Sequence, residues 1–150
     1  MNYRGKGTIE PQIMKQWFVD VNKAAIDWKG KKLSIKEVLQ DMNPWWKKEF
    51  TLEFKERELH KKIEKYLQLR QIITFTGLRR VGKTTLMLKI VEDEIKKGFN
   101  ARNILFFSFD DFRGIGIDEL IKTYEELLEK NIKEGKYLLL LDEIQRLDNW

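Results

Sequence analysis

The chain has 150 residues, the usual length of one domain. Hydrophobic residues make up 42% of it and charged residues 35%, so it has enough apolar surface for a core and a disordered chain is excluded. The absence of cysteine excludes a disulfide scaffold, a cysteine-type zinc site and a thiol nucleophile. No apolar run approaches the ~20 residues of a membrane span, and no signal-peptide core follows Met1. We therefore expect a soluble, cytoplasmic protein without a membrane partner.

The net charge of +5 is unevenly distributed along the chain. Residues 1–70 hold 16 Lys and Arg against 10 Asp and Glu, whereas residues 71–150 hold 13 against 14. A basic first half is typical of a protein with an anionic partner such as nucleic acid. A solvated, lysine-rich helical surface gives the same excess, and the sequence leaves both interpretations open.

The sequence predicts that the first half of the chain is mainly helical. Apolar residues at steps of three or four predict an amphipathic helix over residues 11–28. Ser34 followed by Glu37 forms a capping-box pattern for a short helix over 35–41. A third helix is expected over 53–69 from its apolar stripe.

Two aromatic residues and one histidine in this half invite a functional interpretation. Trp45 and Trp46 follow Asn43-Pro44, and they either stack on adenine or nucleic-acid bases, or attach the N-terminal helices to the rest of the protein. His60, the single histidine, is expected on a charged helix face without a role. Residues 1–48 are predicted to form a small, basic helical segment.

The second half alternates between strand and helix patterns. The predicted elements are a strand over 72–76, a helix over 84–97, a strand over 103–109, a helix over 117–134 and a strand over 137–141. Strands that are apolar throughout indicate a parallel sheet covered on both faces. The predicted fold class is α/β, with a parallel sheet and flanking helices.

A phosphate-binding loop (Walker A) lies between the first of these strands and the helix after it. Residues 77–84 fit G-x-x-x-x-G-K-[ST] at every fixed position, so backbone N–H groups and the helix dipole can hold an anion. Lys83 can reach the β- and γ-phosphates, and the Thr84 hydroxyl can ligate Mg²⁺. The candidate nucleotide-binding residues are Gly77, Leu78, Arg79, Arg80, Val81, Gly82, Lys83, Thr84 and Thr85.

An acidic pair follows the last apolar strand, in the position of a Walker B motif. Asp142 is expected to hold Mg²⁺ opposite Thr84, and Glu143 to act as general base toward the attacking water. Lys83 and Glu143 are thus the candidate catalytic residues. A small-molecule kinase on this fold needs no such glutamate, because its acceptor supplies the nucleophile.

These motifs, with residues 76–86 and 141–147 around them, resemble the AAA-superfamily ATPases of archaea and bacteria, in the group called archaeal ATPases. The resemblance covers about residues 41–150 and implies a P-loop NTPase fold, ATP and Mg²⁺ as cofactors, and ATP hydrolysis. It also implies adenine contacts near Arg57 and Tyr66. Asp110, at the end of a strand on the nucleotide edge, is expected either to join the metal shell or to cap its loop, as is Asp111.

The resemblance further implies that another strand lies between the phosphate-loop strand and the Asp–Glu strand, followed by a helical lid. Neither follows residue 142 in this sequence. We therefore expect residues 49–150 to be the N-terminal part of an AAA-type ATPase domain that does not hydrolyse ATP alone. Hydrolysis in the complete protein would serve an unknown partner, which is a protein, a second copy of the chain or nucleic acid. The alternative is a fragment that binds nucleotide without hydrolysing it.

Overall fold

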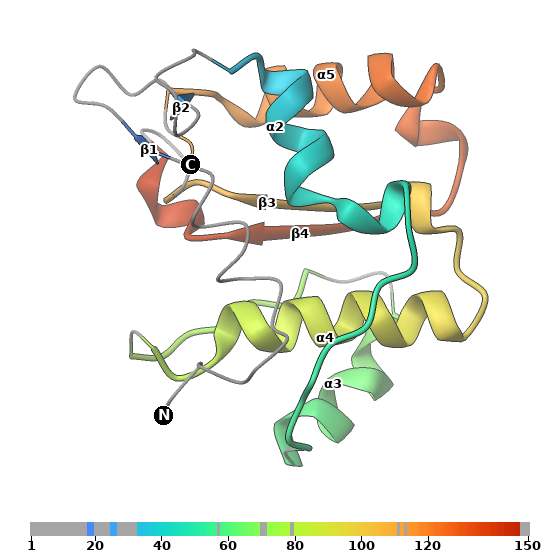
Figure 1. The fold of residues 1–150 in the computed structure, drawn as a ribbon. Helices are drawn as coiled ribbons and strands as arrows, with labels where there is room; N and C mark the ends of the chain where they lie inside the picture. The colour runs from blue at the N-terminus through green and yellow to red at the C-terminus, as the bar shows by residue number, and fades with distance from the viewer. Residues whose placement is uncertain are drawn as a thin grey trace.

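The computed structural model describes residues 33–56, 58–69, 72–78, 80–110, 112 and 114–147, together with the backbone of two short strands at 18–19 and 25–26. The parallel sheet of β3 (Ile104–Ser108) and β4 (Leu138–Asp142) lies between helical layers. On one face lie α2 (Ile35–Met42) and α5 (Ile117–Leu128); on the other lies α4 (Lys83–Lys96), with α3 (Glu58–Leu67) packed beyond it (Figure 1). The predicted α/β architecture is confirmed.

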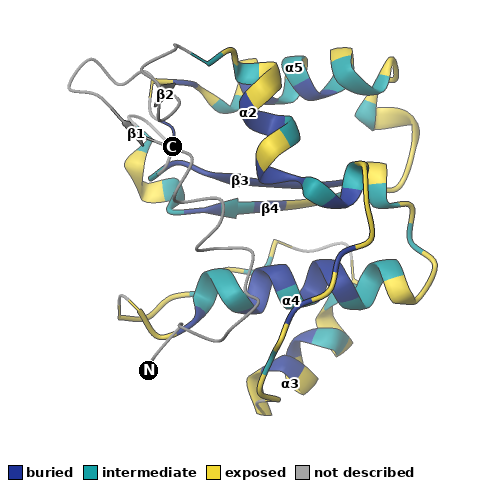
Figure 2. Ribbon diagram, in the orientation of Figure 1, coloured by how far each residue is buried: buried dark blue, intermediate teal, exposed yellow. Residues whose placement is uncertain are grey.

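The register of the sheet places the acidic motif at its carboxyl edge. Ile104 lies beside Leu138, and the ladder runs to Ser108 beside Asp142. Every residue of β3 is buried, as expected for a strand covered on both faces (Figure 2). The core around it joins β3 to α2, α4 and α5, and it includes Leu140 of β4, two residues before Asp142.

The helix predicted over residues 11–28 is contradicted where the structure describes that segment. β1 (Phe18–Val19) pairs antiparallel with β2 (Ala25–Ile26). These four residues include aromatic and β-branched side chains, which fit an extended backbone as well as a helical stripe, so apolar spacing alone misassigned them. The rest of the predicted helix lies outside the described residues.

The capping box of α2 is present as predicted. The Ser34 amide donates to Glu37 Oε2 at 2.9 Å, and the Glu37 amide donates to Ser34 Oγ at 3.3 Å. The helix ends at Met42, before Asn43 and the short 3₁₀ turn η1 (Pro44–Trp46). Proline at the start of η1 prevents α2 from continuing, as the sequence indicated.

Trp45 and Trp46 attach this turn to the sheet. Both indole Nε1 atoms donate to the carbonyl of Ile104, at 3.1 and 2.8 Å. The Trp46 ring also stacks on Tyr124, with 5.5 Å between ring centroids. The packing interpretation of the two tryptophans is therefore confirmed. Trp45 is 4% exposed and the Trp46 ring is already stacked on Tyr124, so both rings are engaged within the protein rather than presented to a base or an adenine ring.

Residues 72–76 do not form the predicted strand; the described segment 72–78 is irregular, and Ile72 is 96% exposed. Among the described residues β4 pairs only with β3. An apolar run can adopt a strand only where a neighbouring strand supplies hydrogen bonds, and this segment has none in the described part of the chain.

The helices differ from their predicted bounds mainly at their ends. α3 starts at Glu58 rather than at residue 53, and α4 spans Lys83–Lys96. α5 ends at Leu128 because Glu129 adopts a left-handed backbone, and a separate 3₁₀ turn, η3 (Ile132–Glu134), follows. No helix in the described part of the chain is both long and apolar enough to span a bilayer.

Candidate functional site

The loop between residues 77 and 82 has the backbone that its glycines permit. Gly77 has φ of 154° and Gly82 has φ of 96°, both in a region that side chains disfavour. Arg80, between them, adopts φ of 61° despite its side chain. Gly82, the N-cap of α4, has no side chain to cap the helix, so this residue leaves the first N–H groups of α4 without a capping acceptor. This arrangement is suited to an anion.

Lys83, the first residue of α4, folds its side chain back over the loop. Its Nζ donates to the carbonyls of Gly77 at 3.1 Å and Leu78 at 2.9 Å. Both carbonyls belong to the loop that would surround a phosphate. The ammonium group is therefore already placed at the loop, held by neutral acceptors that a phosphate oxygen can replace.

Thr84 connects the loop to the carboxyl end of β4. Its Oγ1 donates to Asp142 Oδ2 at 2.5 Å, across 58 residues of sequence. Asp142 is 5% exposed, and burial raises the pKa of its carboxyl, while the Thr84 hydrogen bond opposes that rise. The two side chains proposed as metal ligands thus lie in contact. Their site is buried, so a charged carboxylate there is unfavourable without a positive charge beside it.

Thr84 and Asp142 suit a Mg²⁺ ion that is also bound by water and phosphate better than a metal ion whose ligands are all protein side chains. The described residues contain no group of three or more His, Cys, Asp or Glu able to hold an ion. Mg²⁺ in nucleotide sites commonly takes one or two protein oxygens, and its other ligands are water and phosphate. A hydroxyl and a buried carboxylate meet that requirement, and a divalent cation would compensate the Asp142 charge.

Glu143 follows Asp142 in a left-handed backbone, with φ of 54° and ψ of 37°. Its amide donates to Asp142 Oδ1 at 3.1 Å. Its carboxylate accepts from Gln145 Nε2, which lies 2.5 Å from Oε2. The 3₁₀ turn η4 (Ile144–Arg146) follows, and Arg146 Nη2 lies 3.3 Å from Asp110 Oδ1 at the end of β3. Asp110 therefore contacts this turn.

The remaining predicted site residues lie around the loop or outside the described residues. Leu78, Arg80 and Val81 are exposed, and Thr85 is half-buried on α4. Tyr66 is half-exposed on α3. Placement is not described for Arg57, Arg79 and Asp111.

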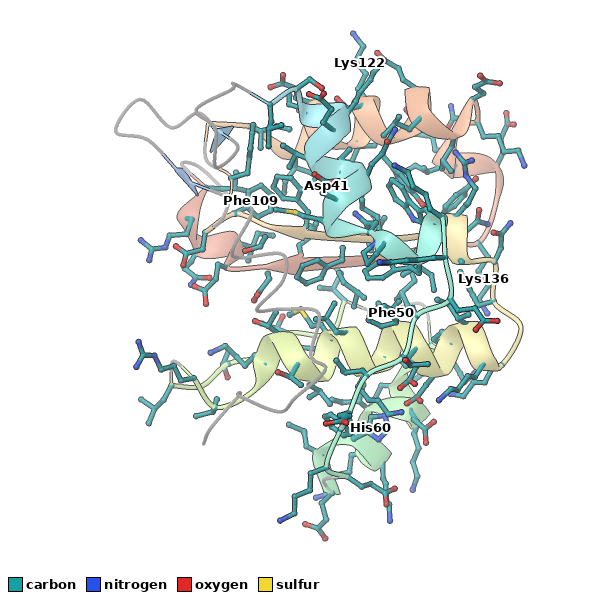
Figure 3. The ribbon with its side chains drawn as sticks, in the orientation of Figure 1. Asp41, Phe50, His60, Phe109, Lys122 and Lys136 are labelled. Atoms are coloured by element: carbon teal, nitrogen blue, oxygen red, sulfur yellow. The ribbon has the colours of Figure 1, made fainter. Side chains whose placement is uncertain are left out.

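His60, expected on a charged helix face without a role, has a buried side chain with a partner on another helix. It is buried between α3 and α4, and its Nε2 lies 2.6 Å from Asp93 Oδ2 (Figure 3). Lys89 Nζ lies 2.8 Å from Asp93 Oδ1 and 2.7 Å from a Glu92 oxygen, which joins the histidine to an ion-pair network on α4. The helical pattern places His60 beside charged residues of α3 but contains no signal for its partner on another helix.

A cavity of about 480 Å³ opens beside this network. Its lining includes Phe54, His60, Lys89 and Asp93. The lysines that line it are already paired with carboxylates of α3 and α4. The network therefore connects the helix that begins at Lys83 to the segment that precedes the loop.

Comparison with known proteins gives a family match over the loop and the sheet. Residues 69–150, more than half of the chain, match the model of a family described as an AAA domain. Such a domain implies a nucleotide-binding module of the P-loop ATPase kind. No solved structure matches the chain significantly.

Similar curated proteins come from an archaeon and a bacterium. Two uncharacterized proteins of Methanocaldococcus jannaschii are 35% identical over 96 residues (61% of this chain, 20% of the relative) and 31% identical over 123 residues (80% and 24%). An uncharacterized protein of Haemophilus influenzae is 28% identical over 98 residues, or 58% of this chain and 24% of the relative. The chain thus spans a fifth to a quarter of the length of these relatives.

Proposed function

The chain belongs to the AAA domain family, and we propose that it is the Mg²⁺-dependent, ATP-binding part of an ATPase. Residues 49–150 would supply the phosphate loop and the acidic motif of that ATPase. Residues 1–48 would form a basic N-terminal segment, which α2 joins to the core around β3. Hydrolysis in the complete protein would act on a partner, which is another protein, a second copy of the chain or nucleic acid.

The observation that carries this proposal is the hydrogen bond between Thr84 and Asp142, at 2.5 Å. Two motifs far apart in sequence meet there, and Lys83, next to Thr84 at the start of α4, reaches back to the loop. An ordinary glycine turn before a helix does not require a buried carboxylate beside the first turn of that helix. A metal–phosphate site requires that arrangement.

In the proposed reaction the phosphates of ATP lie in the loop of residues 77–82 and accept hydrogen bonds from its backbone. Lys83 exchanges the carbonyls of Gly77 and Leu78 for phosphate oxygens. Thr84 and Asp142 would hold Mg²⁺, which when bound neutralises charge on the phosphates. Glu143 takes a proton from water as that water attacks the γ-phosphorus and the bond to the bridging oxygen breaks, releasing ADP.

Nucleotide binding tests the first half of the proposal. Lys83→Ala should abolish binding of Mg·ATP, measured by calorimetry or by a fluorescent analogue, because the loop loses the ammonium group that lies at the carbonyls of Gly77 and Leu78. Lys122→Ala is the matched control, since it makes the same change on an exposed face of α5. Equal ATP affinity in Lys83→Ala and the parent protein would contradict the proposal.

Turnover tests the second half. In the complete protein, Glu143→Gln should keep the affinity for Mg·ATP and reduce phosphate release by about 10²- to 10⁴-fold, the usual contribution of a general base. If a protein that hydrolyses ATP retains its full rate after this change, Glu143 is not the base. If the parent protein binds ATP without hydrolysing it under any condition, the nucleotide-binding alternative replaces the hydrolase.

A further inference from the structure

The turn that follows the acidic motif holds the Glu143 side chain in one place. Gln145 Nε2 donates to Glu143 Oε2 at 2.5 Å, which leaves Oε1 of the same carboxylate without that donor. An amide at this distance restricts rotation of the glutamate side chain. It does so without a charge, so it does not compete with a cation for the carboxylate.

The backbone of the turn supports the same contact. Glu143 has φ of 54°, a left-handed conformation that is unfavourable for a residue other than glycine. Such strain persists only where surrounding bonds impose it. Here the Arg146 amide donates to the Glu143 carbonyl at 2.9 Å, and the Leu147 amide donates to the Ile144 carbonyl at 3.0 Å.

The turn is also anchored to the neighbouring strand. Arg146 Nη2 lies 3.3 Å from Asp110 Oδ1, just beyond the end of β3. The amide of Glu143 donates to Asp142 Oδ1, while Asp142 Oδ2 accepts from Thr84. The backbone of Glu143 is therefore bonded to the proposed metal ligand, and its carboxylate is bonded to a turn that Arg146 joins to Asp110.

We propose that Gln145 is a positioning residue that fixes the carboxylate of Glu143 so that its other oxygen, Oε1, can accept a proton from the attacking water. This inference rests on the proposed function, because it concerns the base of the same reaction. Arg146 and Asp110 act with it by holding the turn against β3. None of the three residues contacts the nucleotide in this role.

The test replaces Gln145 by Met in the complete protein, which keeps the length of the side chain and removes the donor. We expect kcat for ATP hydrolysis to fall about 10- to 100-fold, since a misplaced catalytic group loses rate of this order. KM, the affinity for Mg·ATP and the melting temperature should stay unchanged. Gln68→Met, at an exposed position after α3, is the matched control.

Single-turnover rates in a Glu143→Gln background complete the design. Adding Gln145→Met to that variant should cause no further loss, because the positioned carboxylate is already absent. An additional loss there, or a fall in ATP affinity or melting temperature in Gln145→Met alone, would show a different role and overturn the inference. An unchanged kcat in Gln145→Met overturns it too, while a turnover defect of Glu143→Gln leaves the proposed function standing. Full turnover in Glu143→Gln overturns both.

Discussion

The side chain of Asn43 forms two hydrogen bonds with the backbone of Phe106. Its Nδ2 donates to the Phe106 carbonyl at 2.9 Å, and its Oδ1 accepts from the Phe106 amide at 2.7 Å. A neighbouring strand would make the same two contacts. Because Trp45 and Trp46 donate to Ile104, two residues earlier on the same edge, this edge of β3 is already occupied. A further strand in this sheet can therefore be added only beside β4.

Replacement of Asn43 should destabilise the protein. Asn43→Ala leaves the buried N–H and carbonyl of Phe106 without partners, and each such loss costs about 1–3 kcal/mol. Asn43→Asp keeps the shape but buries a carboxylate, so a loss of similar size is expected. Chemical denaturation monitored by tryptophan fluorescence measures both free energies of unfolding.

The control for this prediction is Asn100→Ala, which removes a single exposed hydrogen bond to the Arg102 amide. Its cost should stay near 1 kcal/mol or below. If Asn43→Ala is no more destabilising than Asn100→Ala, Asn43 does not replace a strand at this edge.

The contact between His60 and Asp93 should stabilise the packing of α3 on α4. His60→Ala removes both the hydrogen bond and the ring that packs on Phe54, so we expect a loss of about 2–4 kcal/mol. His60→Phe keeps an aromatic ring there and removes only the bond, so its loss should be smaller. Lys62→Ala, on the exposed face of α3, is the control for the free energies of unfolding. Equal stability of His60→Ala and the control would show that the contact contributes nothing.

The ion-pair network on α4 should make stability depend on pH in the acid range. Burial raises the pKa of Glu92 and of Asp93, but hydrogen bonds from Lys89 outweigh it with help from Lys96 and His60, so both pKa values lie below their ordinary 4.5 and 3.8. The unfolded chain then binds more protons than the folded chain at acid pH. The stabilisation is therefore full above those ordinary values and is lost as pH falls through the lowered ones.

A urea titration at several pH values measures this dependence. Glu92→Gln should reduce the free energy of unfolding at neutral pH and weaken its fall at acid pH, because one of the two carboxyls with a lowered pKa is gone. Glu119→Gln, an exposed change on α5, should leave the slope as in the parent protein. If the free energy of unfolding of Glu92→Gln falls as steeply at acid pH as that of the parent protein, the network does not control this pH dependence.

The sequence predicts the loop of residues 77–84 because its chemistry depends on local spacing: two glycines, a lysine and a threonine within eight residues at the start of a helix. The capping box of α2 is readable for the same reason, since Ser34 and Glu37 are three residues apart. Both features need no knowledge of the rest of the fold. The apolar pattern of β3 and β4 likewise predicts a covered parallel sheet.

Contacts between distant segments could not be predicted in this way. Asn43 bonds to a residue 63 positions away, and His60 to one 33 positions away, and neither has a local pattern that names its partner. Residues 72–76 are apolar and β-branched, which indicates a strand, yet a strand also needs a neighbour that no local pattern supplies. The Gln145 contact is local but depends on the left-handed backbone of Glu143. That conformation is uncommon for residues other than glycine, so the sequence does not predict it.

The hydroxyl of Thr84 should determine how strongly nucleotide binding depends on Mg²⁺. Thr84→Val keeps the shape of the side chain and removes the oxygen that bonds to Asp142, so one of two proposed protein ligands is lost. We expect ATP affinity in excess Mg²⁺ to fall about tenfold or more, toward the value that the parent protein shows in EDTA. Thr84→Ser retains the hydroxyl and should keep most of the Mg²⁺ effect. If Thr84→Val shows the full difference between Mg²⁺ and EDTA, the metal is bound elsewhere, and the contact between Thr84 and Asp142 only fastens α4 to β4.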